Sequence, residues 1–229
     1  MRVGAGEPLG CVRCSPRGAT TYYPLTDILA RVAEIAESWQ QAPGPNVMLG
    51  GPDPFGHPEL PAIVAGCVKR GAERICIETD GGALSVQGNA EGALASGVRH
   101  LHVRVLAAAE PVSDDLSGRL GLVRDAKAGV RAFLTAAEGQ GTAVAVTAIM
   151  PVCSHSLGAL PPSVGAVAAW PVHAVRLVAA GPLPDSAAGV VAAACDTGMV
   201  NRLWVETDGT LPLPNSHRLH AVAGDSCDG

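Results

Sequence analysis

The sequence predicts an α/β fold with a parallel sheet in a single domain, and three observations support this prediction. Short apolar runs typical of strands alternate with longer segments of helical periodicity. Hydrophobic residues make up 48% of the chain and charged residues only 16%, which is enough apolar material for a sizeable core. No linker-like stretch interrupts the pattern, so we expect one domain over residues 1–229, with a core at about 7–214 and a flexible tail at 215–229.

Helices are expected where apolar residues recur in steps of three and four. The clearest case is residues 25–39, in which Leu25, Ile28 and Trp39 belong to one apolar stripe. A second helical pattern begins at residue 57, with Pro58 in the first turn, where proline is tolerated. The expected helices span 25–39, 57–71, 89–97, 122–138, 157–170 and 185–197.

Strands are expected at the apolar runs between these helices, at 46–51, 74–82, 100–107, 142–151, 174–182 and 202–209. Their alternation with helices implies right-handed crossovers and a parallel sheet, and about six units fall short of an eightfold barrel. Ligands bind at the carboxyl ends of parallel strands. We therefore expect a site in the loops at 7–18, 50–57, 78–83, 104–118, 150–156 and 181–186.

Charge and hydropathy limit the expected partners. The net charge is −5, and the Lys and Arg residues are scattered rather than clustered, so nucleic acid is not an expected partner. Apolar runs break before the roughly 18 residues that a membrane span needs, and no basic-then-apolar leader precedes the first motif. We therefore expect a cytoplasmic protein that does not bind a membrane.

The cysteines favour metal binding or burial over disulfide bonds. Their number, seven, is odd, which argues against a disulfide framework. Cys67, Cys76 and Cys195 stand on expected helix or strand faces, which predicts core positions. Cys11 and Cys14 form a C-x-x-C pair in "CVRCSPRG", a spacing that occurs in metal and redox sites.

The loop "GGPDPFGHPEL" at residues 50–60 ends an expected strand and begins an expected helix. Its glycines allow a ligand to approach the backbone, and Asp53 could accept a hydrogen bond from an ammonium group. A glycine- and proline-rich turn that binds nothing is the competing interpretation, and the local sequence does not decide between the two.

The order of motifs along the chain resembles that of the radical SAM superfamily, in particular the branch with a GPEP loop. The resemblance covers about residues 7–214 and includes the segments "CVRCSPRG", "GGPDPFGHPEL", "ICIETDGGAL", "HLHVRVLA", "GLVRDAKAGVRAFLTAAEGQGTAVAVTAIMP", "VRLVAAGPLP" and "WVETDGTLPLP". It implies a radical-SAM-like partial (β/α)6 barrel, similar to a TIM barrel, with a parallel sheet.

The resemblance also implies two cofactors. In that family a C-x-x-x-C-x-x-C loop holds three irons of a [4Fe–4S] cluster through thiolates, which suit soft metal centres. The fourth iron binds the amino and carboxyl groups of S-adenosylmethionine. The implied metal ligands are Cys11 and Cys14, and the implied cofactor-binding positions are Gly50, Gly51, Pro52, Asp53, Glu78, Thr79 and Arg104.

The sequence departs from the family pattern at four places. The first cysteine of the loop should stand at position 7, where the chain has Glu7. The acidic residue of the GPEP loop is shortened to Asp53, and a late cysteine of the family is absent after Leu213 and Pro214. Only six residues precede the loop, which is barely enough for a first strand.

Three interpretations of Cys11 and Cys14 stay open. The first is a degenerate loop that holds no cluster and in which the two cysteines are relics. The second is a cluster with a third ligand from Glu7 or Cys153, although a carboxylate is a hard ligand and suits cluster iron less well than a thiolate. The third is half of a zinc site or a redox dithiol, for which the chain lacks a second C-x-x-C or a nearby histidine pair.

Three histidines are expected to be structural. His57 precedes a helix, where capping the turn is the expected role. His100 and His102 alternate along one strand, share its face and are interpreted as a structural pair.

Two further segments carry polar side chains. "MPVCSHS" at 150–156 ends a strand and, with Cys153 and His155, is the best secondary metal position. Asp114, Asp115 and Arg119 are expected in a solvated loop that could meet a substrate.

These observations lead to three functional hypotheses. The leading one is a pseudoenzyme: a radical-SAM-like accessory subunit that forms a heterodimer with another radical SAM protein or pathway enzyme. The alternative is an active [4Fe–4S] enzyme that cleaves S-adenosylmethionine with unusual cluster ligation. The second alternative is a stand-alone module that binds a small molecule and needs no cofactor.

Overall fold

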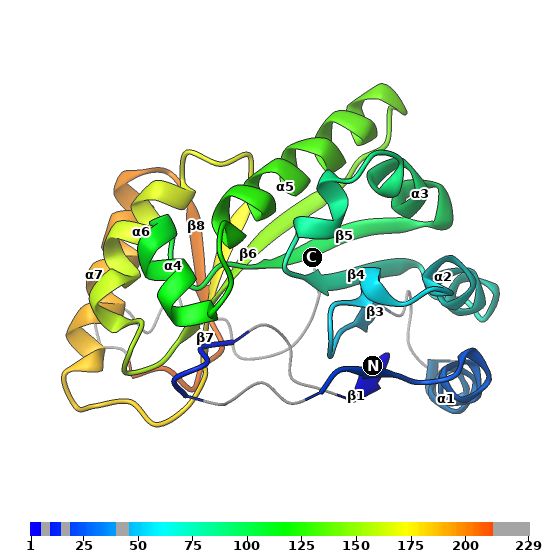
Figure 1. The fold of residues 1–229 in the computed structure, drawn as a ribbon, viewed down its shortest axis with the longest axis horizontal. Coiled ribbons are helices and arrows are strands. Elements are labelled where there is room, and N and C mark those ends of the chain that lie inside the picture. Colours follow the sequence, from blue (N-terminus) through cyan, green and yellow to red (C-terminus); the bar gives the residue numbers. More distant parts are fainter. Residues whose placement is uncertain (6–9, 15–18, 40–45, 213–229) are drawn as a thin grey trace.

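Six parallel strands, hydrogen-bonded to one another in chain order, form the centre of the structure, which is a computed structural model (Figure 1). It describes residues 1–5, 10–14, 19–39 and 46–212, so Glu7, Leu213, Pro214 and the expected tail lie outside the described residues. The strands are β3 (Asn46–Leu49), β4 (Arg74–Thr79), β5 (Val98–Arg104), β6 (Ala145–Val152), β7 (Ala174–Ala179) and β8 (Trp204–Thr207). All six coincide with strands expected from the sequence, and most end earlier.

Helices lie in an arc along the outer face of this curved sheet (Figure 1). They are α1 (Leu25–Trp39), α2 (Leu60–Lys69), α3 (Asn89–Ser96), α5 (Leu122–Gly139), α6 (Leu160–Val167) and α7 (Ala187–Val200), with short 3-10 turns η1 (Pro54–Gly56), η2 (Gly82–Ser85) and η3 (Leu157–Ala159). The bounds of α1 are those expected. Among the described residues, no helix combines the length and the apolar character that crossing a membrane requires.

The start of α2 differs from the expectation. The helix begins at Leu60 rather than at residue 57, and Pro61, not Pro58, occupies its first turn. The turn before it is held by His57, whose Nδ1 accepts from the Glu59 amide at 3.0 Å and whose Nε2 lies 3.0 Å from the Tyr23 carbonyl. His57 is therefore structural, as expected.

The chain before the cysteine loop forms an isolated parallel bridge, from Arg2 to Gly50, just after β3. The Val3 amide donates to the Gly50 carbonyl at 3.0 Å, and the Gly50 amide donates to the Met1 carbonyl at 2.9 Å. The chain then continues into β1 (Gly4–Ala5), which pairs antiparallel with β2 (Thr21–Tyr22). The described residues before the loop are therefore hydrogen-bonded to the edge of the six-stranded sheet but are not one of its strands.

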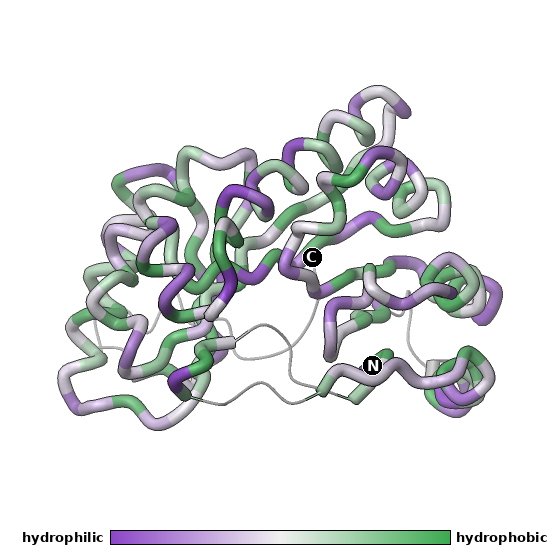
Figure 2. The backbone as a smooth tube through the Cα atoms, viewed as in Figure 1, coloured by the Kyte–Doolittle hydropathy of each residue, from purple (hydrophilic) through white to green (hydrophobic). Residues whose placement is uncertain are grey.

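Alternation along the strands gives the sheet two different faces. The outward face packs against the helices and is fully buried at positions such as Leu49, Ile77, Leu101, Met150 and Leu177. Figure 2 shows hydrophilic residues on the outward turns of α1 and α2, away from this core. Together these observations describe a partial barrel with a parallel sheet, as the sequence predicts.

The sequence predicts a loop at 104–118, and this prediction is wrong for residues 110–117, which form the helix α4 (Glu110–Ser117). Leu116 supplies an apolar buried side chain, while Ser113 and Ser117 are buried beside it without contributing to any hydrophobic stripe. Asp114 and Asp115 therefore lie on a helix, and only Arg119 follows it.

Candidate metal centre

Three cysteine side chains from two distant parts of the chain converge. The Sγ atoms of Cys11, Cys14 and Cys153 all lie within 4.8 Å of one another, which makes them a possible metal site among the described residues. Cys11 and Cys153 are buried, whereas Cys14 is exposed. Glu7, the other ligand considered from the sequence, lies outside the described residues.

Cys153 is fixed by the turn that follows β6. Its amide donates to the Ser156 hydroxyl at 2.9 Å, and its carbonyl accepts from the amides of Ser156 and Leu157 at 3.0 and 3.2 Å. Ser156 is itself buried, and its hydroxyl lies 3.1 Å from the Pro151 carbonyl, which it can donate to. This closed turn holds the thiol at the carboxyl edge of the sheet.

Cys11 and Cys14 are placed by a tight turn and by an apolar cluster. The Cys14 amide donates to the Cys11 carbonyl at 3.0 Å, which closes the C-x-x-C turn. Cys11 packs in a buried cluster composed of Cys11, Leu106, Ala107, Leu116 and Cys153. The cluster brings the cysteine loop, the end of β5, α4 and the end of β6 together.

The thiols already interact with one another. Partial desolvation and the neighbouring thiols of Cys153 and Cys11 raise the pKa of Cys14 to about 12. Burial raises the pKa of Cys153, but hydrogen bonds with Cys14 and Ser156 outweigh it, so that this pKa is lowered overall. Of these two thiols, Cys153 is therefore the one that more readily becomes a thiolate, the form that binds metal.

Three thiolates suit a soft metal centre and leave one position open. Iron–sulfur clusters are held by cysteine thiolates, and structural zinc takes four ligands. No fourth histidine, cysteine or carboxylate joins the triad among the described residues. Three thiolates are the donor set that a cluster with one unshared iron needs, and a structural zinc ion would need a fourth ligand in addition.

The loop that follows β3 lies at the same edge of the sheet. Gly51 has φ +104°, a left-handed conformation that favours glycine, and a side chain at Gly50 would press on the Glu78 carboxylate. Pro52 is buried beside them. The sequence-based assignment of these residues to a cofactor stays a prediction.

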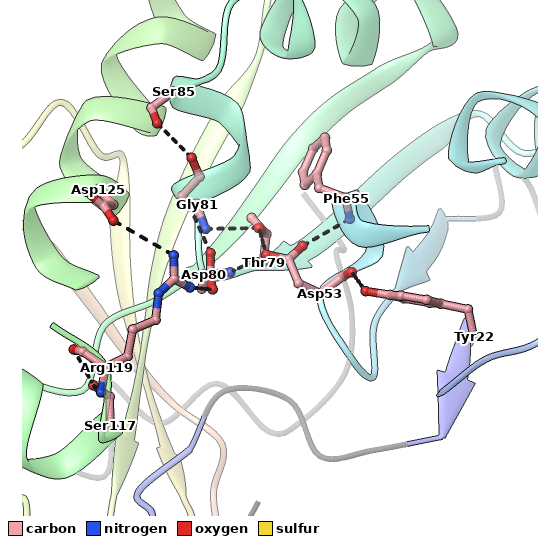
Figure 3. A network of polar contacts seen from close by, with 11 residues as sticks. Tyr22, Asp53, Phe55, Thr79, Asp80, Gly81, Ser85, Ser117, Arg119 and Asp125 are labelled. Atoms are coloured by element: carbon pink, nitrogen blue, oxygen red, sulfur yellow. Dashed lines mark hydrogen bonds and ion pairs between the residues drawn. The ribbon is translucent and has the colours of Figure 1, made fainter. Parts of the chain in front are cut away.

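Asp53 is bound on both carboxylate oxygens by the protein itself (Figure 3). Oδ1 accepts from the Phe55 amide at 3.0 Å, and Oδ2 accepts from the Thr79 hydroxyl at 2.8 Å and the Asp80 amide at 3.2 Å. Burial, followed by the charge of Asp80, raises the pKa of Asp53 to about 7. The carboxyl group therefore connects the ends of β3 and β4, and its expected role as an acceptor from a ligand stays a prediction.

The inner face of the sheet carries two ion pairs that join neighbouring strands. Glu78 pairs with Arg104, and Glu206 pairs with Arg176 at 2.8 Å. His102 lies on β5, the strand that also carries Arg104, and burial, followed by the charge of Arg176, lowers its pKa to about 4. This histidine is therefore neutral near pH 7, which agrees with a structural role.

No protein-family model and no curated protein matches the sequence. Solved structures do match. SuiB from Streptococcus suis, bound to S-adenosylmethionine, gives a TM-score of 0.66 at 10% identity over 90% of this chain and 48% of SuiB. HydG, a maturase of the [FeFe]-hydrogenase, gives 0.61 at 8% identity over 90% of this chain and 50% of HydG. Methylornithine synthase (PylB) gives 0.56 at 11% identity over 90% of this chain and 63% of PylB. These proteins are radical SAM enzymes. The chain has the radical SAM fold.

The chain spans about half the length of the first two structures that it matches. Within the radical SAM fold, Cys11 and Cys14 stand in the loop where the sequence predicts cluster ligands. The structure adds Cys153, which the sequence offered only as one of two third ligands, and brings it to the pair. Sequence reasoning missed the supporting residues Ser156 and Leu116, because a buried serine and one leucine give no local signal.

Proposed function

We propose that this chain is the iron–sulfur core of an enzyme that acts on S-adenosylmethionine. Cys11, Cys14 and Cys153 would be the three thiolate ligands of a [4Fe–4S] cluster. The observation that carries the proposal is the convergence of these three thiols within 4.8 Å on a radical SAM fold.

The third thiol favours the hypothesis of an active enzyme over that of a pseudoenzyme. Loss of a cysteine at position 7 favours a degenerate loop only if no other thiol replaces it. Cys153 is buried, fixed by Ser156 and close to both loop cysteines, so it supplies a soft ligand where the sequence has Glu7. Three ligands leave one iron for a substrate, and a bound cluster of this kind supplies an electron to a sulfonium ligand.

The residues of the chain have separate tasks in this proposal. The buried side chains around Cys11 and Cys153 exclude water from one side of the triad. Exposed Cys14 leaves the other side open to a reductant and to the cofactor. The backbone of 50–53, with Glu78 and Arg104 on the adjoining strands, would orient the polar groups of S-adenosylmethionine. We expect the protein to work in the cytoplasm.

Anaerobic reconstitution with iron and sulfide tests the proposal. The expected result is about four irons and four sulfides per chain, with release of 5′-deoxyadenosine from S-adenosylmethionine after reduction. Iron bound without sulfide, or no iron bound at all, contradicts the proposal.

An accessory subunit is the second candidate, and the open end of the sheet favours it. In the described part of the chain, β8 is the last strand, with Trp204 58% exposed and Val200 at the end of α7 83% exposed. A partner such as another radical SAM protein or pathway enzyme would cover these apolar side chains. Co-expression and size measurement test this heterodimer, and a chain that cleaves S-adenosylmethionine alone contradicts a purely accessory role.

A further inference from the structure

The helix α4 touches the cysteine loop at two points. The Val12 amide donates to the Leu116 carbonyl at 2.8 Å, which satisfies a carbonyl at the end of the helix. The Arg13 guanidinium forms an ion pair with the Asp115 carboxylate at 2.5 Å. Val12 and Arg13 are the two residues between Cys11 and Cys14, so both contacts act within the C-x-x-C turn.

The same carboxyl end of the helix is also joined to the loop that follows β4 and, through it, to the loop that follows β3. Arg119, two residues after the end of α4, pairs with Asp80, and its guanidinium lies 3.8 Å from the Asp125 carboxylate (Figure 3). The Asp80 amide donates in turn to Asp53. The helix therefore connects the cysteine loop with the loop at 50–53.

The third contact is apolar and faces the triad. Leu116 is 2% exposed and belongs to the buried cluster that contains Cys11 and Cys153. Movement of α4 would therefore change the separation between the loop cysteines and Cys153.

We propose that α4 is a clamp that positions Cys11 and Cys14 against Cys153, with Arg13 and Asp115 as its positioning residues. Neither residue offers a ligand atom to the triad, so their effect is exerted through the placement of the loop. The inference rests on the proposed function, because it assigns a role toward the same thiol triad. Arg13 and Asp115 are 52% and 54% exposed, so both tolerate substitution without disturbing the core.

Charge reversal tests the clamp. Arg13→Asp and Asp115→Arg each place like charges together, and the double variant restores an ion pair in the opposite sense. We expect each single variant to release cluster iron to a chelator about threefold to tenfold faster than the wild type, and the double variant to return to within about twofold. Thermal unfolding of the metal-free chain should change little in any of them.

The matched control is the ion pair of Arg31 and Glu34 on α1, joined at 2.7 Å and similarly exposed. Arg31→Asp and Glu34→Arg should leave the rate of iron release unchanged, because α1 contributes nothing to the triad. Single variants of the clamp that release iron at the wild-type rate, or a double variant that is not restored, overturn the clamp.

A second probe separates the clamp from the proposed function. If the wild-type chain assembles no cluster, the proposed function fails, and cobalt(II) then reports on the three thiols through its thiolate absorption band. The clamp predicts that cobalt affinity follows the same order as cluster retention: the single variants bind cobalt more weakly than the wild type, and the double variant recovers the wild-type affinity. Equal affinities in all variants, or no cobalt binding, overturn it.

Discussion

Replacing Asp53 with asparagine is expected to change how the free energy of unfolding depends on pH. Burial, followed by the charge of Asp80, raises the pKa of the Asp53 carboxyl from 3.8 to about 7. With a raised pKa, the folded protein binds this proton more tightly than the unfolded chain does. The free energy of unfolding therefore falls as the pH rises from about 4 to about 7 and then levels off.

The expected magnitude follows from the two pKa values. From about pH 5.5 to about pH 8.5, ionisation of Asp53 should cost the wild-type protein about 2 kcal/mol of unfolding free energy. Asp53→Asn has no such ionisation. Urea unfolding should therefore show that the unfolding free energy of the variant, relative to that of the wild type, is higher at the upper pH than at the lower pH by this amount. The exposed Asp185 gives a control, because Asp185→Asn should run parallel to the wild type. A difference between wild type and Asp53→Asn that stays constant with pH would refute the reasoning.

Two further predictions concern a buried histidine and a close helix contact. Burial lowers the pKa of His102 to about 4, so the folded protein resists protonation of this side chain. As the pH falls from about 7.5 to about 4.5, the unfolding free energy of the wild type should drop by about 2–3 kcal/mol relative to that of His102→Gln, as measured by urea unfolding. A difference that does not change with pH contradicts this. A side chain at Gly129 of α5 would overlap the carbonyl oxygen of Gly81, so Gly129→Ala should lower the unfolding free energy by about 3 kcal/mol. At the end of the same helix, the added methyl group of Gly139→Ala would meet nothing within 4 Å, so this substitution should raise the unfolding free energy by less than about 1 kcal/mol in the same urea assay. Equal effects of the two substitutions contradict the packing argument.

The strands and most helices could be predicted because their signal is local. Apolar periodicity identified all six strands, and the bounds expected for α1 are those observed. The strand expected at 74–82 ends instead at Thr79, because Gly81 adopts a left-handed conformation that begins a turn. The end of a strand depends on such turn chemistry rather than on hydropathy.

The helix α4 could not be predicted from periodicity. Its sequence, "EPVSDDLS", is polar, and its inward face consists of Leu116 and two serines. The contacts that hold it come from Arg13 and from the residues around Asp80, which are distant in the chain. Tertiary contacts of this kind override a weak local preference.

The site was predictable in its parts but not in its assembly. The C-x-x-C spacing singled out Cys11 and Cys14, and the end of a strand singled out Cys153. Whether the three meet depends on α4 and on the turn at Ser156, and neither has a signature in the sequence. The hydrogen bonds of Asp53 could not be predicted from the sequence either, because its carboxylate accepts from donors of the protein that include Thr79, which is distant in the chain.

The most direct test of the central claim is the iron and sulfide content of Cys153→Ser after anaerobic reconstitution, measured beside wild type and Cys195→Ser. Cys195 is buried in α7 and lies outside the thiol triad, which makes it a matched control. Each thiolate in a metal site contributes about 3–4 kcal/mol, so loss of one ligand should weaken metal binding roughly 10²–10³-fold. The account predicts a full cluster in wild type and Cys195→Ser and almost none in Cys153→Ser. A full cluster in Cys153→Ser would contradict it.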